Sequence, residues 1–270
     1  MTEEGTLNPI VGPEQESAKL TDWIAVVAGA LGALMATLDI SITNTALPQI
    51  QGAIGASGTE GTRIGTGYLV AEVIMIPLTA WFTRLLGLRT LLLITTTAFI
   101  IFSMFCGLSN SLLAMIIGRV GQGFFGGALI PTAQVIIRTR LPVRQMPIGM
   151  SIFGVIVLIG PIWGPVLGGY LAEEISWRWC FFLNLPVGIA LAVLLLVGLP
   201  RENAKPELLA KADWWGIIGM TMRLVASPSY LRKGNAKTGS NPSSLSGSVS
   251  LRSLALPFYS SHRKRALPRL

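Results

Sequence analysis

Charged residues are scarce in this 270-residue chain, and apolar residues take their place. Asp, Glu, Lys and Arg make up 13% of the sequence, hydrophobic residues make up 51%, and the mean hydropathy is +0.61. Soluble globular domains usually carry about 25% charged residues. The composition therefore excludes a soluble globule and predicts an integral membrane protein.

Side chains that bind metals or form covalent intermediates are also scarce. The chain has one histidine, His262, and two cysteines, Cys106 and Cys180. A single histidine without companion ligands does not predict a metal site. The cysteines are expected near the outer ends of two spans, where a disulfide is compatible with the topology but buried free thiols are commoner. We find no nucleophile with a base, phosphate loop or metal cluster, so we expect neither an enzyme nor a cofactor.

Long apolar segments are abundant. A helix needs about 20 mostly apolar residues to cross a hydrocarbon core of about 30 Å. We therefore expect an all-α fold with a six-helix transmembrane domain over residues 23–200. A loop and an incomplete seventh span follow over residues 201–221. The six predicted spans are 23–47, 65–86, 90–108, 112–134, 148–171 and 181–199.

Basic residues mark one side of the membrane. They gather in the loops after the second, fourth and sixth spans, whereas the other loops carry only Arg63 and Arg178. Because short basic loops stay in the cytoplasm, we expect a multi-pass protein of the cell (inner or plasma) membrane with a cytoplasmic amino terminus. Residues 1–22 form the cytoplasmic amino-terminal tail and lack the basic start of a cleaved signal peptide, so the first span should stay as an anchor. The gathered basic residues are Arg84, Arg89, Arg138, Arg140, Arg144, Arg201, Lys205 and Lys211.

Acidic residues are absent from residues 222–270, which are rich in Ser, Arg and Pro. This composition, without amphipathic periodicity, predicts a disordered basic tail. The tail lacks interleaved aromatic residues and any binding motif, so we do not expect a nucleic-acid partner. Because the apolar character stops after Thr221, we interpret the tail as the product of a frameshift or misjoined gene that replaced the rest of a longer protein.

Three ionisable residues nevertheless fall inside predicted spans: Asp39, Glu72 and Arg119. Each costs about 2.5 to 3.5 kcal/mol in a membrane and is a functional-site hypothesis by default. Each lies about seven residues, or roughly 10 Å, from the outer membrane face, so one layer could contain all three. Protonating a carboxylate that is paired with a guanidinium breaks the pair, as a proton-coupled carrier requires. The alternative is an ion pair that only fixes helix packing.

Residues 160–169 (GPIWGPVLGG) combine glycines and prolines in the fifth span. Gly160, Gly164 and Gly168 recur every four residues and share one helix face, which predicts close packing of another helix. Membrane helices tolerate Pro where neighbours satisfy the freed backbone groups.

Four segments resemble motifs of the major facilitator superfamily. Residues 160–169 are similar to its antiporter motif Gly-x3-Gly-Pro-x2-Gly-Gly at every fixed position, including Pro161, Pro165 and Gly169. Residues 38–48 (LDISITNTALP) resemble the first-helix motif of the fourteen-span drug/proton antiporters of the EmrB/QacA type. Residues 119–123 (RVGQG) resemble the fourth-helix RxxQG motif, and residues 177–188 resemble the start of the sixth span.

The resemblance implies the amino-terminal half of a major facilitator fold, built as two inverted three-helix repeats. It implies a proton-coupled multidrug efflux transporter that exchanges lipophilic, often cationic compounds for protons across the lipid bilayer. It assigns proton relay to Asp39 and Arg119. From its place inside a span, we separately expect Glu72 to be a secondary carboxylate facing the cavity. A periplasmic adaptor and an outer-membrane channel are further candidate partners. The alternative is a transport-inactive six-span fragment with at most a binding or regulatory role.

One loop departs from the superfamily pattern. Between the second and third spans the superfamily commonly shows Gly-x3-Asp-[Arg/Lys]-x-Gly-[Arg/Lys], whereas this chain has Ala80, Arg84, Leu85, Gly87 and Leu88 at those places. The acidic residue is missing, so we interpret the arginines of this loop as topology markers.

We also expect the glycine face of residues 160–169, without the other half of the fold, to meet lipid, a second copy of this chain or nothing.

Overall fold

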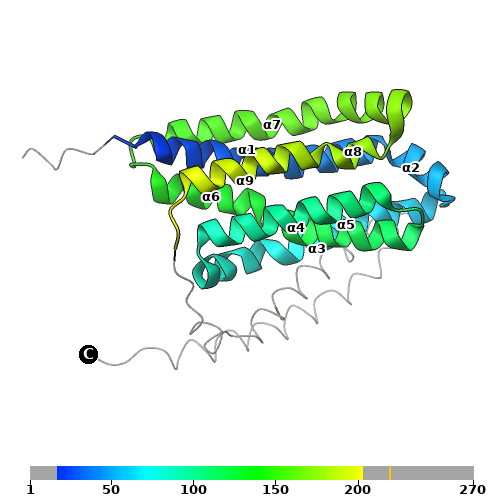
Figure 1. The fold of residues 1–270 in the computed structure, drawn as a ribbon, viewed down its shortest axis with the longest axis horizontal. Helices are drawn as coiled ribbons and strands as arrows, with labels where there is room; N and C mark the ends of the chain where they lie inside the picture. The colour runs from blue at the N-terminus through cyan, green and yellow to red at the C-terminus, as the bar shows by residue number, and fades with distance from the viewer. Residues whose placement is uncertain (1–16, 203–218, 220–270) are drawn as a thin grey trace, which may run out of the picture. The chain divides into compact units, whose positions relative to one another are not determined.

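The computed structural model describes residues 17–202 and residue 219. Within these residues every regular element is helical, and most of the helices run along one direction (Figure 1). The elements are α1 (Leu20–Thr45), α2 (Leu47–Ile54), α3 (Gly58–Leu86), α4 (Leu88–Leu108), α5 (Leu112–Gly126), α6 (Leu129–Arg140), α7 (Met146–Tyr170), the π-helical segment η1 (Leu171–Ser176), α8 (Trp179–Phe182) and α9 (Asn184–Gly198).

Six helical segments of the described chain are long and apolar enough to cross a membrane, which confirms the expected all-helical fold. They comprise α1, α3, α4, α5 with α6, α7 with η1, and α8 with α9. The second begins at Gly58, earlier than predicted, because Ser57 and Glu60 form a capping box at its start. The expected seventh span and basic tail lie outside the described residues.

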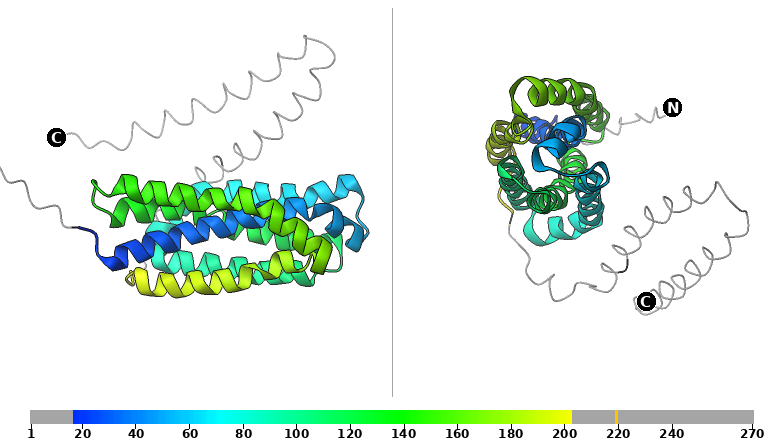
Figure 2. Two further views of the ribbon diagram at one scale, coloured as in Figure 1. Left: turned by 90° about the horizontal axis from the view of Figure 1, so that it is seen from above. Right: turned by 90° about the vertical axis from the view of Figure 1, so that its right-hand side faces the viewer.

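Helix α1 lies between α7 and the rest of the bundle (Figures 1 and 2). Its buried surface consists largely of alanine and glycine, which lets neighbouring backbones approach closely. A Cβ atom added at Gly29 would lie 3.1 Å from the Ala133 Cα atom of α6. The central position of α1 therefore depends on small side chains.

The fourth spanning segment is interrupted between α5 and α6. Pro131 has no N–H group to donate to the Gly127 carbonyl, and its ring would clash with that carbonyl in a regular helix. Helix α5 accordingly ends at Gly126, and α6 begins at Leu129. The segment then continues to Arg140, six residues beyond the predicted end at residue 134.

The glycine strip of α7 packs against α1. A Cβ at Gly160 would lie 3.0 Å from Leu38 N, one at Gly164 would collide with Ser41, and one at Gly168 would lie 2.8 Å from the Ile42 carbonyl oxygen. The expectation that this face meets lipid, a second copy or nothing is wrong, because α1 of the same chain occupies it.

The remaining residues of the antiporter motif point away from α1. Pro161 and Pro165 are exposed, and a Cβ at Gly169 would meet nothing within 4 Å. Pro161 removes the hydrogen bond to the Val157 carbonyl oxygen, and Thr37 Oγ1 of α1 lies 3.5 Å from that oxygen. The same hydroxyl lies nearer, at 3.1 Å, to the Ala33 and Leu34 carbonyl oxygens of its own helix, so it is at most a shared donor for the freed backbone group.

Both ends of α4 are fastened to the segments that flank α9. At one end Arg178 donates to the Gly107 carbonyl oxygen at 2.6 Å and to Asn110 Oδ1 at 2.7 Å. At the other end Arg89 donates to the Leu199 carbonyl oxygen at 2.9 Å, and Glu202 accepts from Leu88 N at 2.8 Å. Arg89 is therefore also a structural contact. The α3–α4 loop lacks an acidic residue, and the carboxylate of Glu202, which follows α9, accepts a hydrogen bond from the first residue of α4.

Candidate functional site

Asp39 and Arg119 form an ion pair inside the helix bundle. Asp39 comes from α1 and Arg119 from α5, and Arg119 Nη1 lies 2.5 Å from Asp39 Oδ2. Their side chains are 0% and 1% exposed. The structure thus brings together two of the three ionisable residues singled out in the sequence, although they are separated by 80 positions.

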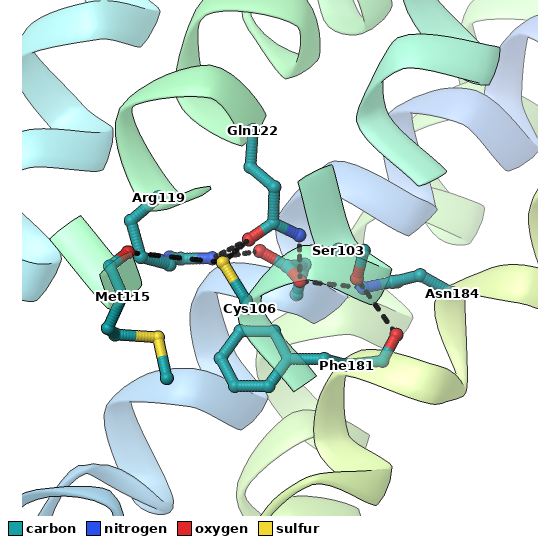
Figure 3. Close-up of polar contacts among 8 residues, drawn as sticks. Ser103, Cys106, Met115, Arg119, Gln122, Phe181 and Asn184 are labelled. Carbon is teal, nitrogen blue, oxygen red and sulfur yellow. Dashed lines mark hydrogen bonds and ion pairs between the residues drawn. The ribbon is translucent and has the colours of Figure 1, made fainter. Parts of the chain in front are cut away.

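Two amide side chains complete the hydrogen bonding of the Asp39 carboxylate. Gln122 Nε2 donates to Asp39 Oδ1 at 3.1 Å, and Asn184 Nδ2 donates to the same oxygen at 2.7 Å. Figure 3 shows Arg119, Gln122 and Asn184 converging from α5 and α9. Every group that hydrogen-bonds to this carboxylate within the described chain is a donor.

Helix α4 supplies the next layer of contacts (Figure 3). Ser103 Oγ accepts from Asn184 Nδ2 at 2.9 Å and donates to the Phe181 carbonyl oxygen at 2.8 Å. Cys106 Sγ lies 3.4 Å from Gln122 Oε1, which also accepts from Arg119 Nη1 at 3.0 Å. These bonds engage both ends of the Gln122 amide, but only the NH2 end of the Asn184 amide.

Tyr68 of α3 covers the face of the guanidinium. Its ring centroid lies 4.2 Å from Arg119 Cζ, a cation–π geometry. Gly123 makes this approach possible, because a Cβ there would collide with the Tyr68 carbonyl oxygen. Tyr68 Oη and Arg119 Nε are buried and make no hydrogen bond to another described residue.

Glu72 stands apart from this network. It lies one helical turn after Tyr68 on α3 and is half-buried. Its carboxylate makes no hydrogen bond or ion pair to the residues that the structure describes, although the charges of Asp39 and Arg119 act on it. The three ionisable residues are therefore neighbours, but only two are in contact.

The sequence reasoning did not assign Gln122, Asn184, Ser103 or Tyr68 to the site. Gln122 and Asn184 stand in the quoted motifs, and an amide in an apolar span is a recognisable signal because it needs a partner. Ser103 and Tyr68 carry no such signal, since Ser and Tyr are ordinary residues of membrane helices. Only the packing of α3 against α5 identifies Tyr68, and only the packing of α4 against α8 and α9 identifies Ser103.

The site has no covalent or metal chemistry to offer within the described residues. No group of three or more His, Cys, Asp and Glu side chains there could hold a metal ion, and Cys106 and Cys180 are buried free thiols. What the arrangement contains is a buried ion pair whose carboxylate also accepts hydrogen bonds from two amides.

Sequence comparison relates the chain to drug exporters. It is 38% identical over 192 residues to the multidrug export protein EmrB of Escherichia coli K12, covering 71% of this chain and 37% of that protein. It is 33% identical over 228 residues to the colistin resistance protein EmrB of Acinetobacter baumannii, covering 84% of this chain and 44% of that protein. The chain thus spans less than half the length of these curated relatives.

Structural comparison shows the same fold in transporters of distant sequence. The proton:xylose symporter XylE matches with a TM-score of 0.59 at 14% identity, over 81% of this chain and 54% of that one. The human organic anion transporter MFSD10 matches with a TM-score of 0.55 at 20% identity, over 68% of this chain and 50% of that one.

A family-level match covers most of the chain. The sequence profile of the Major Facilitator Superfamily matches residues 29–260. This range continues past Met222, so it does not end where the foreign tail is expected to begin, and a foreign origin for that tail stays a prediction. The match, together with the fold, shows that the chain belongs to the Major Facilitator Superfamily.

Proposed function

We propose that the chain forms the six-helix amino-terminal part of a proton-coupled multidrug efflux transporter. The observation that carries the proposal is the Asp39–Arg119 pair, buried in a bundle of membrane-competent helices. An ionisable pair in such a place is costly and is usually functional. The relatives named as multidrug export proteins suggest that the cargo is drugs, and the motif resemblance implies lipophilic, often cationic compounds.

Proton uptake at Asp39 would change the forces that join three helices. The ionised carboxylate holds Arg119 and Gln122 of α5 and Asn184 of α9 to α1. Protonation removes the charge and leaves the guanidinium without its counter-ion in a buried position, which is unfavourable. A rearrangement that gives Arg119 another partner or access to water then becomes favourable, and this couples protonation to helix movement.

Glu72 is the proposed secondary carboxylate for cationic cargo. It is half-buried, carries no ion pair within the described chain and lies in the field of the Asp39–Arg119 pair. A cationic compound near Glu72 and protons at Asp39 would therefore influence each other electrostatically. Because the two positive charges repel each other, binding of the cationic compound would favour release of the proton, and the reverse.

We place the basic end of the bundle in the cytoplasm. The α3–α4 and α6–α7 connections lie at the end where α1 begins, since Ala18 N donates to Gln145 Oε1 at 3.3 Å. That end carries Arg84, Arg89 and Arg144, so the positive-inside rule orients a multi-pass inner-membrane protein with a cytoplasmic amino terminus. A periplasmic adaptor and an outer-membrane channel are proposed partners of the whole transporter.

Transport of a fluorescent cationic dye into vesicles tests the proposal. Vesicles containing only this chain are given an imposed proton gradient, and dye movement is compared with vesicles containing an intact relative. Asp39→Asn in both proteins is the matched control and should abolish proton-driven movement. If the relative moves dye and this chain does not, the chain alone is the transport-inactive six-span fragment. Unimpaired proton-driven transport by the relative that carries the substitution corresponding to Asp39→Asn would refute the role of Asp39 in proton coupling.

A further inference from the structure

We propose that Asn184 is a positioning residue that turns its side-chain amide when Asp39 gains a proton. The inference rests on the proposed function, because it concerns how the carboxyl group can exist in both protonation states. In the ionised state Asn184 donates to Asp39. In the neutral state its carbonyl oxygen accepts the new Asp39 hydroxyl.

The ionised carboxylate is surrounded by donors only. Arg119, Gln122 and Asn184 all donate to Asp39, and no acceptor within the described chain hydrogen-bonds to it. A carboxylic acid also has an O–H group, which needs an acceptor when it is buried. One of the amides must therefore reverse, or the helices must separate, when the proton arrives.

Gln122 is held in its present orientation. Its Oε1 atom accepts from Arg119 Nη1 at 3.0 Å and from Cys106 Sγ at 3.4 Å. Reversing this amide would place its NH2 group against the guanidinium and the thiol. The guanidinium has no acceptor and the thiol sulfur is a weak one, so both present hydrogen bonds would be lost without good replacements. Gln122 therefore remains a donor to Asp39.

Asn184 has no such restriction. Its Nδ2 atom donates to Asp39 Oδ1 and to Ser103 Oγ, whereas its Oδ1 atom makes no hydrogen bond to another described residue. A serine hydroxyl can donate as well as accept. After Asn184 turns, the Asp39 hydroxyl and the Ser103 hydroxyl can both donate to its Oδ1 atom.

The turn conserves the proton but not every hydrogen bond, because the NH2 group of Asn184 gives up Asp39 and Ser103 and moves to the side on which Oδ1 now makes no hydrogen bond to a described residue. The proton ends on Asp39 Oδ1, no bond between heavy atoms changes, and the amide turns by about half a rotation. The Phe181 carbonyl oxygen gives up the Ser103 hydroxyl that it accepts in the ionised state. A backbone carbonyl oxygen that lacks a hydrogen bond costs less free energy than a buried carboxylic acid O–H group that lacks an acceptor.

Other titratable groups near Asp39 do not offer an alternative acceptor. Arg119 is a donor, and none of the others hydrogen-bonds to Asp39 in the described chain. Helices α2 and α9 contain no titratable residue, and those of α6 and α7 lie at the helix ends. The titratable groups that face Asp39 are Arg119 of α5, Tyr68 and Glu72 of α3, Cys106 of α4 and Cys180 of α8.

Infrared difference spectroscopy of the full chain in lipid bilayers tests the inference. The chain is produced with ¹³C-labelled asparagine side chains and titrated with acid. The band of the protonated Asp39 carboxyl group is identified by its absence in Asp39→Asn. We expect an asparagine carbonyl band to shift with the same pH midpoint, because its oxygen changes from unbonded to accepting.

Two variants assign that second band. Asn184→Ser should remove the shift, whereas the matched control Asn110→Ser, at the exposed contact with Arg178, should preserve it. Because the band shift is measured in the unmutated protein, loss of stability in a variant cannot account for it.

The two hypotheses fail in different ways. If the Asp39 band titrates and no asparagine carbonyl band shifts with it, the amide does not turn and this inference is wrong, while the proton role of Asp39 stands. If the Asp39 band does not titrate wherever the bundle remains folded, the proposed proton coupling is wrong and the inference falls with it.

Discussion

The described chain contains two ion pairs of the same chemical type in opposite surroundings. Arg119 and Asp39 are 1% and 0% exposed, lie 2.5 Å apart and belong to a network with two amides. Arg140 and Glu202 are 23% and 41% exposed, lie 3.8 Å apart and join the ends of two spanning segments. Both pairs join a guanidinium to a carboxylate, so a difference between the effects of mutating them reports the difference in their surroundings.

Burial decides what each pair can do. Exposed pairs contribute about 0 to 1 kcal/mol because water and salt screen them. Removing one partner of a buried pair costs about 3 to 5 kcal/mol, since it leaves an uncompensated charge. Loss of charge on one partner should therefore perturb the buried pair far more than the exposed pair.

Neutralising Asp39 should have the largest effect on stability. Asp39→Asn leaves the Arg119 guanidinium buried without a counter-ion, so we expect the free energy of unfolding to fall by about 3 to 5 kcal/mol. Chemical denaturation of the purified chain in detergent measures the change. Combining it with Arg119→Gln should recover part of the loss, because no buried charge then remains. A double variant that is less stable than Asp39→Asn alone would contradict this account.

The packing of α7 against α1 sharpens the comparison, because it holds the helix that carries Asp39. Gly164→Ala places a methyl group against Ser41, and such overpacking typically costs about 1 to 3 kcal/mol. Gly169→Ala is the matched control, since its methyl group would meet open space. Thermal unfolding of the two variants separates the effects. Equal loss at both positions would mean that the close contact with α1 is unimportant.

The ring over Arg119 tests the buried pair from its other side. Tyr68→Leu should cost about 1 to 2 kcal/mol, because a desolvated cation–π contact is lost. Tyr68→Phe keeps the ring and removes only an unpartnered hydroxyl, so its stability should be equal to or slightly above that of the unmodified chain. Denaturant midpoints of both variants give the answer. A costly Tyr68→Phe change would show that the hydroxyl has a partner.

The exposed pair should show the smallest effect. Arg140→Ala should change the free energy of unfolding by no more than about 1 kcal/mol, and added salt should reduce the difference. Glu202→Ala should cost slightly more, because the acceptor for Leu88 N is then also lost. Unfolding at low and high ionic strength measures both. An effect of Arg140→Ala as large as that of Asp39→Asn would remove the contrast between the two pairs.

The sequence predicted the parts of this site that carry a strong local signal. Asp39 and Arg119 stand out because charge is expensive in an apolar span, and the glycines of α7 stand out by their four-residue spacing. It could not predict that Glu72 makes no ion pair with another described residue, since residues at a similar depth in different spans can face different neighbours. It also assigned the glycine face to the wrong partner, because motif spacing identifies a contact face and not its occupant.

Apolar length and the placement of charge determined, from the sequence alone, that this chain forms six membrane-competent helices with an ionisable centre, because the bilayer penalises every exposed backbone group and every unpaired charge. Only the tertiary structure decided that Gln122 and Asn184 complete the Asp39 site, that Tyr68 covers Arg119, and that α7 lies on α1. Those pairings depend on which helix faces meet, and helix rotation is set by side-chain packing between segments that are distant in the chain.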